Sequence, residues 1–356
     1  MNLETQNILF LLRAPQHGGT ENVVLQLCEI FKPLVNKIVV TSAEGFAVEK
    51  LKQYKIKHFV IPDIERKSPR TIINVCKTIK QIVEEEHITV IHTHHRMAAF
   101  YVRLLGLYKT CYFINTSHNT FDNYRVLTRY AYRKANLIAC GEMVKKNLVE
   151  AFGLENVTVI HNAVKAFKSE IVIDPELRSD KEAGKLLIGN IGRLSEQKGM
   201  EYFIKAIPGV VKEHPEAQFY IIGSGKNEKK LKEMSKGFPV SFMGYRTDIQ
   251  NLMSQLDLVV LSSLWEGLPL TPIEAFSVGK TVVATSVDGT LEIVKDGKNG
   301  LLVESKDSKG LTDKINWMIE HPEEKQKMEI NARKTFESEF SFNILEQAYV
   351  DYYRQL

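Results

Sequence analysis

The chain has 356 residues, of which 44% are hydrophobic and 25% are charged, the proportions of an ordinary globular protein. At roughly 100–200 residues per domain, this length predicts two domains with sizeable cores. No stretch approaches the ~20 apolar residues that span a bilayer, and the opening residues are too few and too acidic for a signal peptide, so a cytoplasmic protein is expected. The four cysteines are widely spaced within apolar patterns, which predicts reduced core residues and not disulfides or metal ligands.

Charge is distributed unevenly along the chain, although the net charge is only +4. Residues 1–170 hold 23 Lys and Arg against 15 Asp and Glu, or +8, and residues 171–356 hold 24 against 28, or −4. The basic first half favours an anionic partner, such as a membrane surface or a phosphorylated acceptor. Nucleic acid is not among the expected partners.

The first half alternates short apolar runs with helical patterns, which predicts a parallel α/β sheet. The expected strands are 7–12, 37–42, 57–62, 88–92, 111–117, 137–140 and 157–160, with helices at 21–31, 70–86 and 124–135. Gly18 and Gly19 lie at the first strand-to-helix turn, where backbone N–H groups and a helix end favour an anion. The pair is not a GxGxxG motif, so a simple tight turn remains an alternative.

Histidines follow two of these strands. His92, His94 and His95 come at the end of the strand 88–92, and His118 follows the strand 111–117. Zinc is poorly supported because no Cys, Asp or Glu cluster accompanies them; a hydrogen-bonding rim of an interdomain cleft and structural histidines are the better interpretations. A lone histidine is usually structural, but His118 ends a strand in the same sheet as the glycine turn, which favours a position facing the same cleft.

A basic, aromatic helix is predicted at 124–135. Its basic residues and its tyrosines are Arg125, Arg129, Arg133, Lys134, Tyr124, Tyr130 and Tyr132. The pattern fits either a surface helix with tyrosines packed inward or a helix that lies on an acidic membrane face.

Residues 165–184 lose periodicity and are predicted to be a linker. The βα alternation then resumes with strands at 185–191, 218–222, 240–243, 256–263, 281–285 and 301–303, and helices at 199–213, 226–236, 247–254 and 272–278, before a helical tail at 307–354. Two doubly wound halves therefore follow one another, and a cleft between them is the default ligand site.

Two loops of the second half carry charges suited to one ligand. Arg193 and Lys198 lie between a strand and a helix, where they could neutralise a diphosphate or be ordinary exposed residues. Glu266 and Glu274 flank a segment that reads as loop and then helix start; they are either solvated acids near a helix N-terminus or acceptors for hydroxyls. Cations for a diphosphate and carboxylates for sugar hydroxyls together predict a nucleotide-sugar site.

These motifs carry a resemblance that covers nearly the whole chain. In order they are GGTENVVLQL at 18–27, IHTHH at 91–95, SHN at 117–119, HNAV at 161–164, GRLSEQKG at 192–199, IIGSG at 221–225, EGLPLTPIEA at 266–275 and SVDGTLEIVKDGKNGLLV at 286–303. The sequence resembles the retaining glycosyltransferases of family 4, whose fold is GT-B. The resemblance implies an α/β protein with two Rossmann-like, doubly wound parallel-sheet domains that face across a cleft.

The resemblance also implies roles for single residues. Glu274 would bind the donor ribose, Glu266 the transferred sugar, and Arg193 and Lys198 the diphosphate, a task that needs no metal and no cofactor. His118 would lie near the donor sugar. The implied catalytic residues are Arg193, Lys198, His118 and Glu266. The implied donor-binding residues are Gly18, Gly19, Arg193, Lys198, Arg246, Glu266, Gly267, Leu268, Pro269, Leu270, Thr271 and Glu274.

The resemblance finally implies domain limits and partners. An acceptor-binding domain is expected at 1–168, a donor-binding domain at 169–340, and a last helix at 341–356 that packs back toward the first domain. The expected donor is a UDP sugar. The expected acceptor is a saccharide or a polyprenyl-diphosphate-linked saccharide in capsule or exopolysaccharide assembly, with the basic half on the inner face of the cell membrane.

Three other functions stay open at this point. A nucleotide-sugar epimerase shares the architecture but lacks the two-glutamate segment beside the GRL…KG loop. A dinucleotide oxidoreductase would need a GxGxxG turn after a strand, which is absent from the sequence. A non-catalytic sugar-nucleotide-binding subunit would not be expected to keep the charged set.

Overall fold

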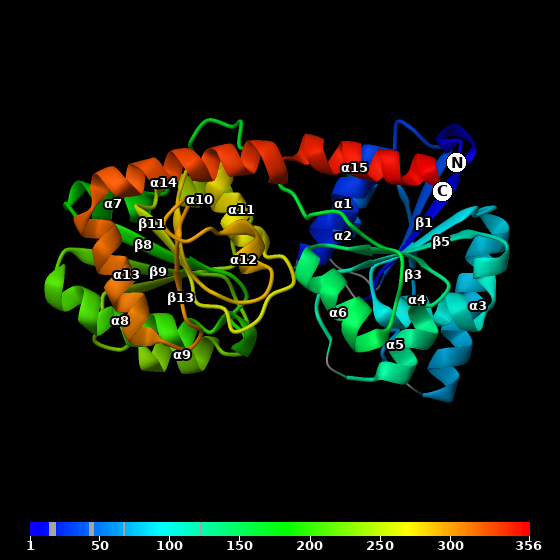
Figure 1. The fold of residues 1–356 in the computed structure, drawn as a ribbon, viewed down its shortest axis with the longest axis horizontal. Coiled ribbons are helices and arrows are strands. Elements are labelled where there is room, and N and C mark those ends of the chain that lie inside the picture. The colour runs from blue at the N-terminus through cyan, green and yellow to red at the C-terminus, as the bar shows by residue number, and fades with distance from the viewer. Residues whose placement is uncertain (14–18, 43–45, 67, 122) are drawn as a thin grey trace. The chain divides into compact units, whose positions relative to one another are not determined.

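The computed structural model describes residues 1–13, 19–42, 46–66, 68–121 and 123–356. They form two compact units, one of residues 1–162 with 345–356 and the other of residues 163–344 (Figure 1). Each unit is a doubly wound α/β structure built on one parallel sheet, with seven strands in the first unit and six in the second. This confirms the predicted fold class.

The first unit has the strand order β3-β2-β1-β4-β5-β6-β7. Its strands are β1 Asn7–Leu11, β2 Lys37–Ser42, β3 Lys57–Val60, β4 Val90–Thr93, β5 Tyr112–Ser117, β6 Asn136–Ala139 and β7 Val157–Val159. Its helices are α1 Gly19–Phe31, α2 Phe46–Gln53, α3 Pro69–Glu85, α4 Arg96–Leu104, α5 Arg125–Tyr132 and α6 Glu142–Phe152. The direction of winding reverses between β1 and β4, so the carboxyl ends of these strands are where the fold provides a ligand crevice.

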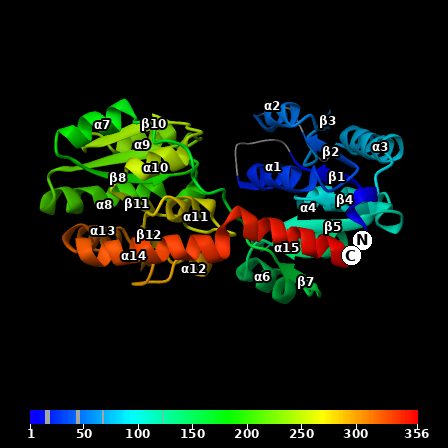
Figure 2. The same cartoon turned by 90° about the horizontal axis from the view of Figure 1, so that it is seen from above.

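The last helix, α15 (Phe342–Gln355), packs against the sheet of the first unit on the same side as α1 (Figure 2). The rings of Phe31 and Tyr353 lie 4.3 Å apart. The Tyr353 hydroxyl is 2.8 Å from Nδ1 of His92 on β4, and the Tyr349 hydroxyl is 3.2 Å from Oγ1 of Thr116 on β5. Aromatic packing and buried hydrogen bonds therefore fix the register of α15 on the sheet.

The second unit has the strand order β10-β9-β8-β11-β12-β13. Its strands are β8 Leu186–Ile191, β9 Ala217–Ile222, β10 Val240–Gly244, β11 Leu258–Leu261, β12 Val282–Thr285 and β13 Leu301–Val303. Its helices are α7 Pro175–Glu182, α8 Met200–Glu213, α9 Glu228–Met234, α10 Ile249–Gln255, α11 Leu270–Ser277, α12 Thr290–Ile293, α13 Ser308–Glu320 and α14 Pro322–Thr335. Here the winding reverses between β8 and β11, and the loops after these two strands are the candidate ligand loops.

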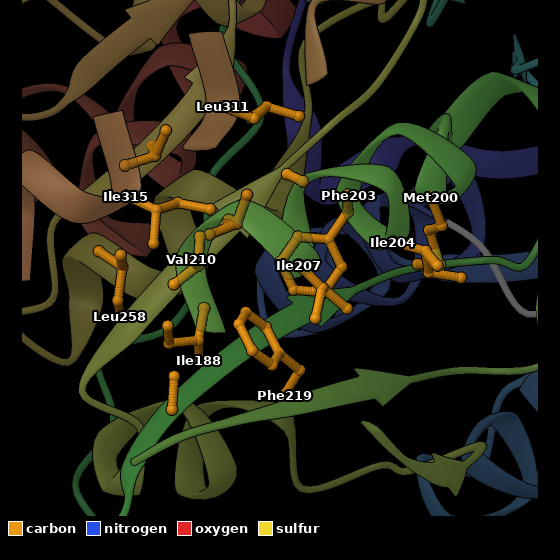
Figure 3. Packing of buried hydrophobic residues seen from close by; sticks show 14 of the residues in the cluster. Ile188, Met200, Phe203, Ile204, Ile207, Val210, Phe219, Leu258, Leu311 and Ile315 are labelled. Atoms are coloured by element: carbon orange, nitrogen blue, oxygen red, sulfur yellow. The ribbon is translucent and has the colours of Figure 1, made fainter. Parts of the chain in front are cut away.

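One large apolar cluster holds α8 and α13 on a single face of this sheet (Figure 3). Phe203 and Ile207 of α8 pack on Ile188 of β8 and Phe219 of β9, and all four are fully buried. Gly209 allows α13 to approach closely, because a Cβ at this position would lie 2.6 Å from a methyl carbon of Thr312. The core thereby fixes the strands whose ends carry the charged loops.

The predicted linker at 165–184 is wrong over residues 175–182, which form α7. Oδ1 of Asp174 accepts hydrogen bonds from the backbone N–H groups of Glu176 (3.1 Å) and Leu177 (3.4 Å), and Pro175 occupies the first helical turn. Leu177 is the one buried residue of this helix. Hydrophobic periodicity was therefore too weak to indicate the helix, whereas its Asp-Pro start is a helix-start signal in the sequence.

Candidate functional site

The loop between β8 and α8 is held by close backbone contacts. Gly192 has a φ of 155°, and a Cβ on Gly223 would lie 2.0 Å from its carbonyl oxygen. Leu194 is fully buried; its N–H donates to the carbonyl of Ser224 (2.9 Å) and its own carbonyl accepts from the N–H of Asn227 (3.0 Å). This anchoring leaves Arg193 exposed at one end of the loop and Lys198 partly buried at the other.

The loop between β11 and α11 is joined to the first loop along its length. Oγ of Ser262 donates to the carbonyl of Lys198 (3.1 Å), and the N–H of Leu264 donates to the carbonyl of Gln197 (2.7 Å). Gly199 makes this approach possible, because a Cβ there would lie 2.1 Å from the carbonyl oxygen of Ser262, and its φ of 53° suits glycine. The two predicted ligand loops are therefore held together by hydrogen bonds and close backbone contact.

A buried ion pair joins the two loops. Nζ of Lys198 is 2.6 Å from Oε1 of Glu266, and their side chains are 18% and 7% exposed. The same Oε1 accepts from Oγ of Ser263 at 2.7 Å, and Nε2 of Gln197 is 3.5 Å from Oε2. The carboxylate of Glu266 is thus neutralised and hydrogen-bonded, as a buried charge must be.

A third loop, after β12, supports the backbone beside Glu266. The N–H of Glu266 donates to Oδ2 of Asp288 at 3.0 Å, and Asp288 has a φ of 33°, a left-handed conformation that Asp tolerates better than most residues. A Cβ on Gly289 would lie 1.7 Å from the carbonyl oxygen of Gly267, so only glycine permits this contact. The segment Gly267–Pro269 is thereby fixed before α11 begins at Leu270.

Glu274 lies in α11, and its carboxylate has a different environment from that of Glu266. Within the described residues, its side chain has no hydrogen-bond partner. Burial raises the pKa of Glu274 to about 7, and the positive charge of Lys198 acts in the opposite direction. A half-buried carboxylate that lacks a protein partner is suited to accept hydrogen bonds from a ligand.

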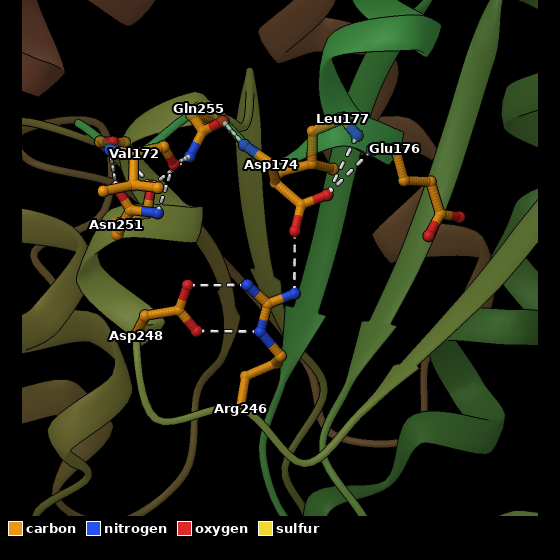
Figure 4. A network of polar contacts seen from close by, with 9 residues as sticks. Val172, Asp174, Glu176, Leu177, Arg246, Asp248, Asn251 and Gln255 are labelled. Carbon is orange, nitrogen blue, oxygen red and sulfur yellow. Dashed lines mark hydrogen bonds and ion pairs between the residues drawn. The ribbon is translucent and has the colours of Figure 1, made fainter.

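Arg246 belongs to a separate network (Figure 4). Its guanidinium group contacts Oδ2 of Asp174 at 2.8 Å and binds both carboxylate oxygens of Asp248, at 2.7 and 2.9 Å. These carboxylates raise its pKa. The side chain therefore holds the start of α7 against the loop before α10, and its predicted contact with a ligand stays a prediction.

The remaining predicted residues lie in the first unit. Gly19 opens α1, whereas Gly18 lies outside the described residues. His118 follows β5 and is partly exposed; its Nε2 is 3.0 Å from Nδ1 of the buried His94. His92 is occupied on both nitrogens, by the Tyr353 hydroxyl and by Oγ1 of Thr116, each at 2.8 Å. The structure thus brings His94 and His118 together and gives His92 a structural role in the first unit.

Several residues of the site were given no functional role from the sequence, although three of them lie within the quoted motifs. Gln197, Ser263, Asp288 and His94 each touch a predicted site residue; Ser263 does so within its own loop, and the other three do so across two separate strand ends. The signal that the sequence offered for Ser263 and Asp288 was a polar residue at or after the end of the strands 256–263 and 281–285. Nowhere in the described ranges do three His, Cys, Asp or Glu side chains gather as a metal ion would require. In the part of the chain that the structure describes, no helix is both long and apolar enough to cross a membrane.

Two doubly wound parallel-sheet units, with charged loops at the carboxyl ends of the strands, define the GT-B class of proteins. Residues 17–166 match the family Glycosyltransferase Family 4, and residues 175–335 match the family Glycosyl transferases group 1. The chain therefore belongs to the glycosyltransferases of these two families, as the resemblance of its motifs predicted.

Individual relatives agree with this assignment, and a solved structure has the same fold. The UDP-Gal:alpha-D-GlcNAc-diphosphoundecaprenol alpha-1,3-galactosyltransferase of Escherichia coli is 26% identical over 329 residues, which cover 82% of this chain and 82% of that protein. An uncharacterised glycosyltransferase of Methanocaldococcus jannaschii is 25% identical over 237 residues, so the chain spans 60% of that protein's length. The crystal structure of Anabaena HepE in complex with UDP has a TM-score of 0.84 at 22% identity and covers 99% of this chain and 100% of HepE.

Proposed function

We propose that the protein transfers a sugar from a UDP sugar to a saccharide or a polyprenyl-diphosphate-linked saccharide, with retention of anomeric configuration and without a metal ion. The process would be the assembly of a cell-surface polysaccharide such as a capsule or exopolysaccharide. The observation that carries the proposal is the ion pair of Lys198 and Glu266 in the same unit as Glu274, whose carboxylate has no hydrogen-bond partner among the described residues. The name of the Escherichia coli relative, which specifies a UDP sugar and a lipid-diphosphate acceptor, supports the same substrate classes.

The cations of the β8–α8 loop would stabilise the leaving nucleotide. Lys198 has three N–H donors and gives one to Glu266, so its ammonium group can also bind a diphosphate oxygen. Arg193, exposed on the same loop, offers a planar fork to two oxygens. As the bond from the sugar to the diphosphate breaks, charge develops on the diphosphate, and fixed cations stabilise that charge in place of a metal ion.

Glu266 is better suited to binding than to nucleophilic attack. Its Oε1 already accepts from Lys198 and Ser263, and Gln197 lies against its Oε2, so neither oxygen is left without a protein neighbour. Retention would therefore follow a front-face route. The acceptor oxygen bonds to the sugar on the face from which the diphosphate departs, and a departing phosphate oxygen takes the proton of the acceptor hydroxyl. Glu266 would contact a hydroxyl of the transferred sugar.

A donor panel tests the substrate class. We expect UDP sugars to raise the unfolding temperature more than GDP or ADP sugars at equal concentration, because a ligand that binds only the folded state stabilises it. Transfer to a polyprenyl-diphosphate-linked saccharide should persist in EDTA, and NMR of the product should show the anomeric configuration of the donor. Epimerisation of the donor without an acceptor, or binding of a nicotinamide cofactor, would instead favour the rival functions.

Donor affinity is expected to fall as the pH drops below about 7. The proposed role of Glu274 needs its ionised form, and burial raises its pKa to about 7, so protonation should cost up to about tenfold in affinity per pH unit. Calorimetric titration with UDP-glucose, a diphosphate diester that keeps its charge over this range, measures the effect. Glu274→Gln should bind weakly at every pH; a wild-type affinity that does not change with pH would contradict the assignment.

The folding stability of the ligand-free protein should change in the opposite sense. A carboxyl group whose folded pKa is raised adds stability that is fully present below its unfolded pKa and is lost as the pH rises through about 7. The unfolding temperature of the wild type, measured relative to that of Glu274→Gln, should therefore fall as the pH rises from about 5 to about 8. This control separates titration of Glu274 from titration of the ligand.

Helix α5 is proposed to rest on an acidic membrane face, with the protein peripheral on the cytoplasmic side. Arg125 and Arg129 of the helix and Arg133 directly after it are exposed, Val126 is 85% exposed and Tyr130 is 40% exposed. Exposed apolar and aromatic groups beside cations suit the interface of an anionic bilayer. The tyrosines are divided between the two predicted alternatives, because Tyr132 is buried whereas Tyr130 faces solvent.

Binding to vesicles with anionic lipid should decrease at least tenfold when Arg125, Arg129 and Arg133 are replaced by Gln, since each cation near the surface contributes about 1 kcal/mol. Vesicle sedimentation at low and high salt measures this. The matched control replaces three exposed lysines of the second unit, Lys212, Lys229 and Lys309, by Gln. Equal losses in both variants, or binding that salt does not weaken, would contradict the membrane role.

A further inference from the structure

Three histidine rings lie in contact at the carboxyl ends of β4 and β5. The rings of His92 and His94 stack with centroids 4.3 Å apart, and those of His94 and His118 lie 5.3 Å apart at 20°. A hydrogen bond of 3.0 Å joins Nδ1 of His94 to Nε2 of His118. His92 and His94 are buried, whereas His118 is partly exposed, so the row ends at the surface of the first unit.

The row leaves His94 little freedom to turn. His92 is fixed on both nitrogens by Tyr353 and Thr116, each at 2.8 Å, and it provides the surface on which His94 stacks. Phe10 lies beside both rings, with centroids 5.6 Å from His92 and 6.0 Å from His94. His94 therefore keeps its Nδ1 toward His118.

Counting protons decides the direction of the hydrogen bond between His94 and His118. Nε2 of His94 is buried and has no hydrogen-bond partner in the described structure. If His118 were the donor, neutral His94 would carry its proton on Nε2 and bury an unpaired N–H group. If His94 is the donor, its Nε2 carries no proton, and only an acceptor lone pair is left unpaired. Buried unpaired donors are the rarer and costlier case, so His94 donates through Nδ1–H.

The surroundings keep His94 and His118 neutral, and the assignment of their protons holds only for neutral rings. Burial lowers the pKa of His94 well below its ordinary value, helped by His92 and His118, and lowers the pKa of His118 to about 4. Neither ring therefore carries a second proton at neutral pH. Because Nε2 of His118 accepts from His94, the single proton of His118 must lie on Nδ1.

We propose that His94 is a positioning residue that holds His118 in its Nδ1–H tautomer, so that His118 offers a hydrogen-bond donor to an oxygen of the sugar substrate. The contact of His118 with substrate rests on the proposed function, whereas the tautomer of His118 does not. His118 would then polarise a sugar oxygen. It could not act as a general base, because its acceptor nitrogen is occupied by His94.

Nitrogen-15 NMR of the imidazole rings tests the tautomer directly in the whole chain. We expect Nδ1 of His118 to be protonated in the wild type, the opposite of the tautomer that a free imidazole prefers, and its N–H signal to change on addition of UDP-glucose. In His94→Asn the amide nitrogen can still donate, so the tautomer should persist. In His94→Leu it should change to Nε2–H, and kcat/KM should fall about tenfold, the equivalent of one hydrogen bond.

The results separate the two parts of the inference. An Nε2–H tautomer in the wild type, which needs no variant, would overturn the proposal, as would an unchanged tautomer in a folded His94→Leu protein. A loss of activity in His94→Asn as large as that in His94→Leu would also count against it, because the retained donor should rescue. Wild-type turnover in His118→Leu would instead overturn the substrate contact and the assigned role of His118, whatever the tautomer.

Discussion

Turnover should fall by about 10²-fold or more in Lys198→Ala and in Arg193→Ala, because each variant removes a fixed cation from the proposed leaving-group site. The loss should appear in kcat at saturating donor, since the charge on the diphosphate is greatest in the transition state. Initial rates of transfer with a UDP sugar and a lipid-diphosphate acceptor measure it. Lys205→Ala, which removes an exposed lysine of α8, is the matched control and should retain wild-type turnover.

The role of Lys198 in catalysis must be separated from its role in folding. Removal of Lys198 leaves the carboxylate of Glu266 buried with no ion-pair partner, and this loss should lower the unfolding temperature. The double variant Lys198→Ala with Glu266→Gln removes the unpaired charge as well, so its stability should recover while its turnover stays low. Near-normal turnover in both single variants would refute the assignment of these cations.

Donor affinity should fall by about 10²-fold in Glu274→Gln, because a charged acceptor for hydroxyl groups contributes about 1.5–3 kcal/mol for each hydrogen bond. Gln keeps the size of the side chain but not its charge. Calorimetric titration with UDP-glucose measures the dissociation constant, and Glu170→Gln, on an exposed residue of the same unit, is the matched control. Donor binding equal to that of the wild type would show that Glu274 lies outside the donor site.

The sheets could be predicted from the sequence almost completely. Every strand in the described part of the chain coincides with a predicted apolar run to within two residues at each end. The reason is that strands of a parallel sheet are buried on both faces and read as continuous apolar runs. Helices were harder. Helix α4 begins at an unusual cap, with Nδ1 of His95 accepting from the N–H of Met97, and α6 begins after Gly141 without a side-chain cap.

The site could be predicted only in part. Arg193, Lys198 and Glu266 are charged residues in loops that follow strands, and Glu274 lies in the helix after the second loop, so sequence alone indicates them; the structure places Lys198 against Glu266. Their supporting residues depend on loops that meet only in the folded chain. The same limit applies to Arg246, whose partner Asp174 lies 72 positions away, and a carboxylate at that distance has no signature near the arginine.

The path of the chain through the two units has a consequence for synthesis on the ribosome. Residues 345–356 supply Tyr349 and Tyr353 to the core of the first unit, yet they are translated after the whole of residues 163–344. Because domains tend to fold as they emerge, the second unit can finish folding while the first unit still lacks α15, which leaves Nδ1 of His92 without the Tyr353 hydroxyl and Thr116 without the Tyr349 hydroxyl. Loss of these twelve residues should therefore damage the early-made half of the protein and leave the late-made half folded.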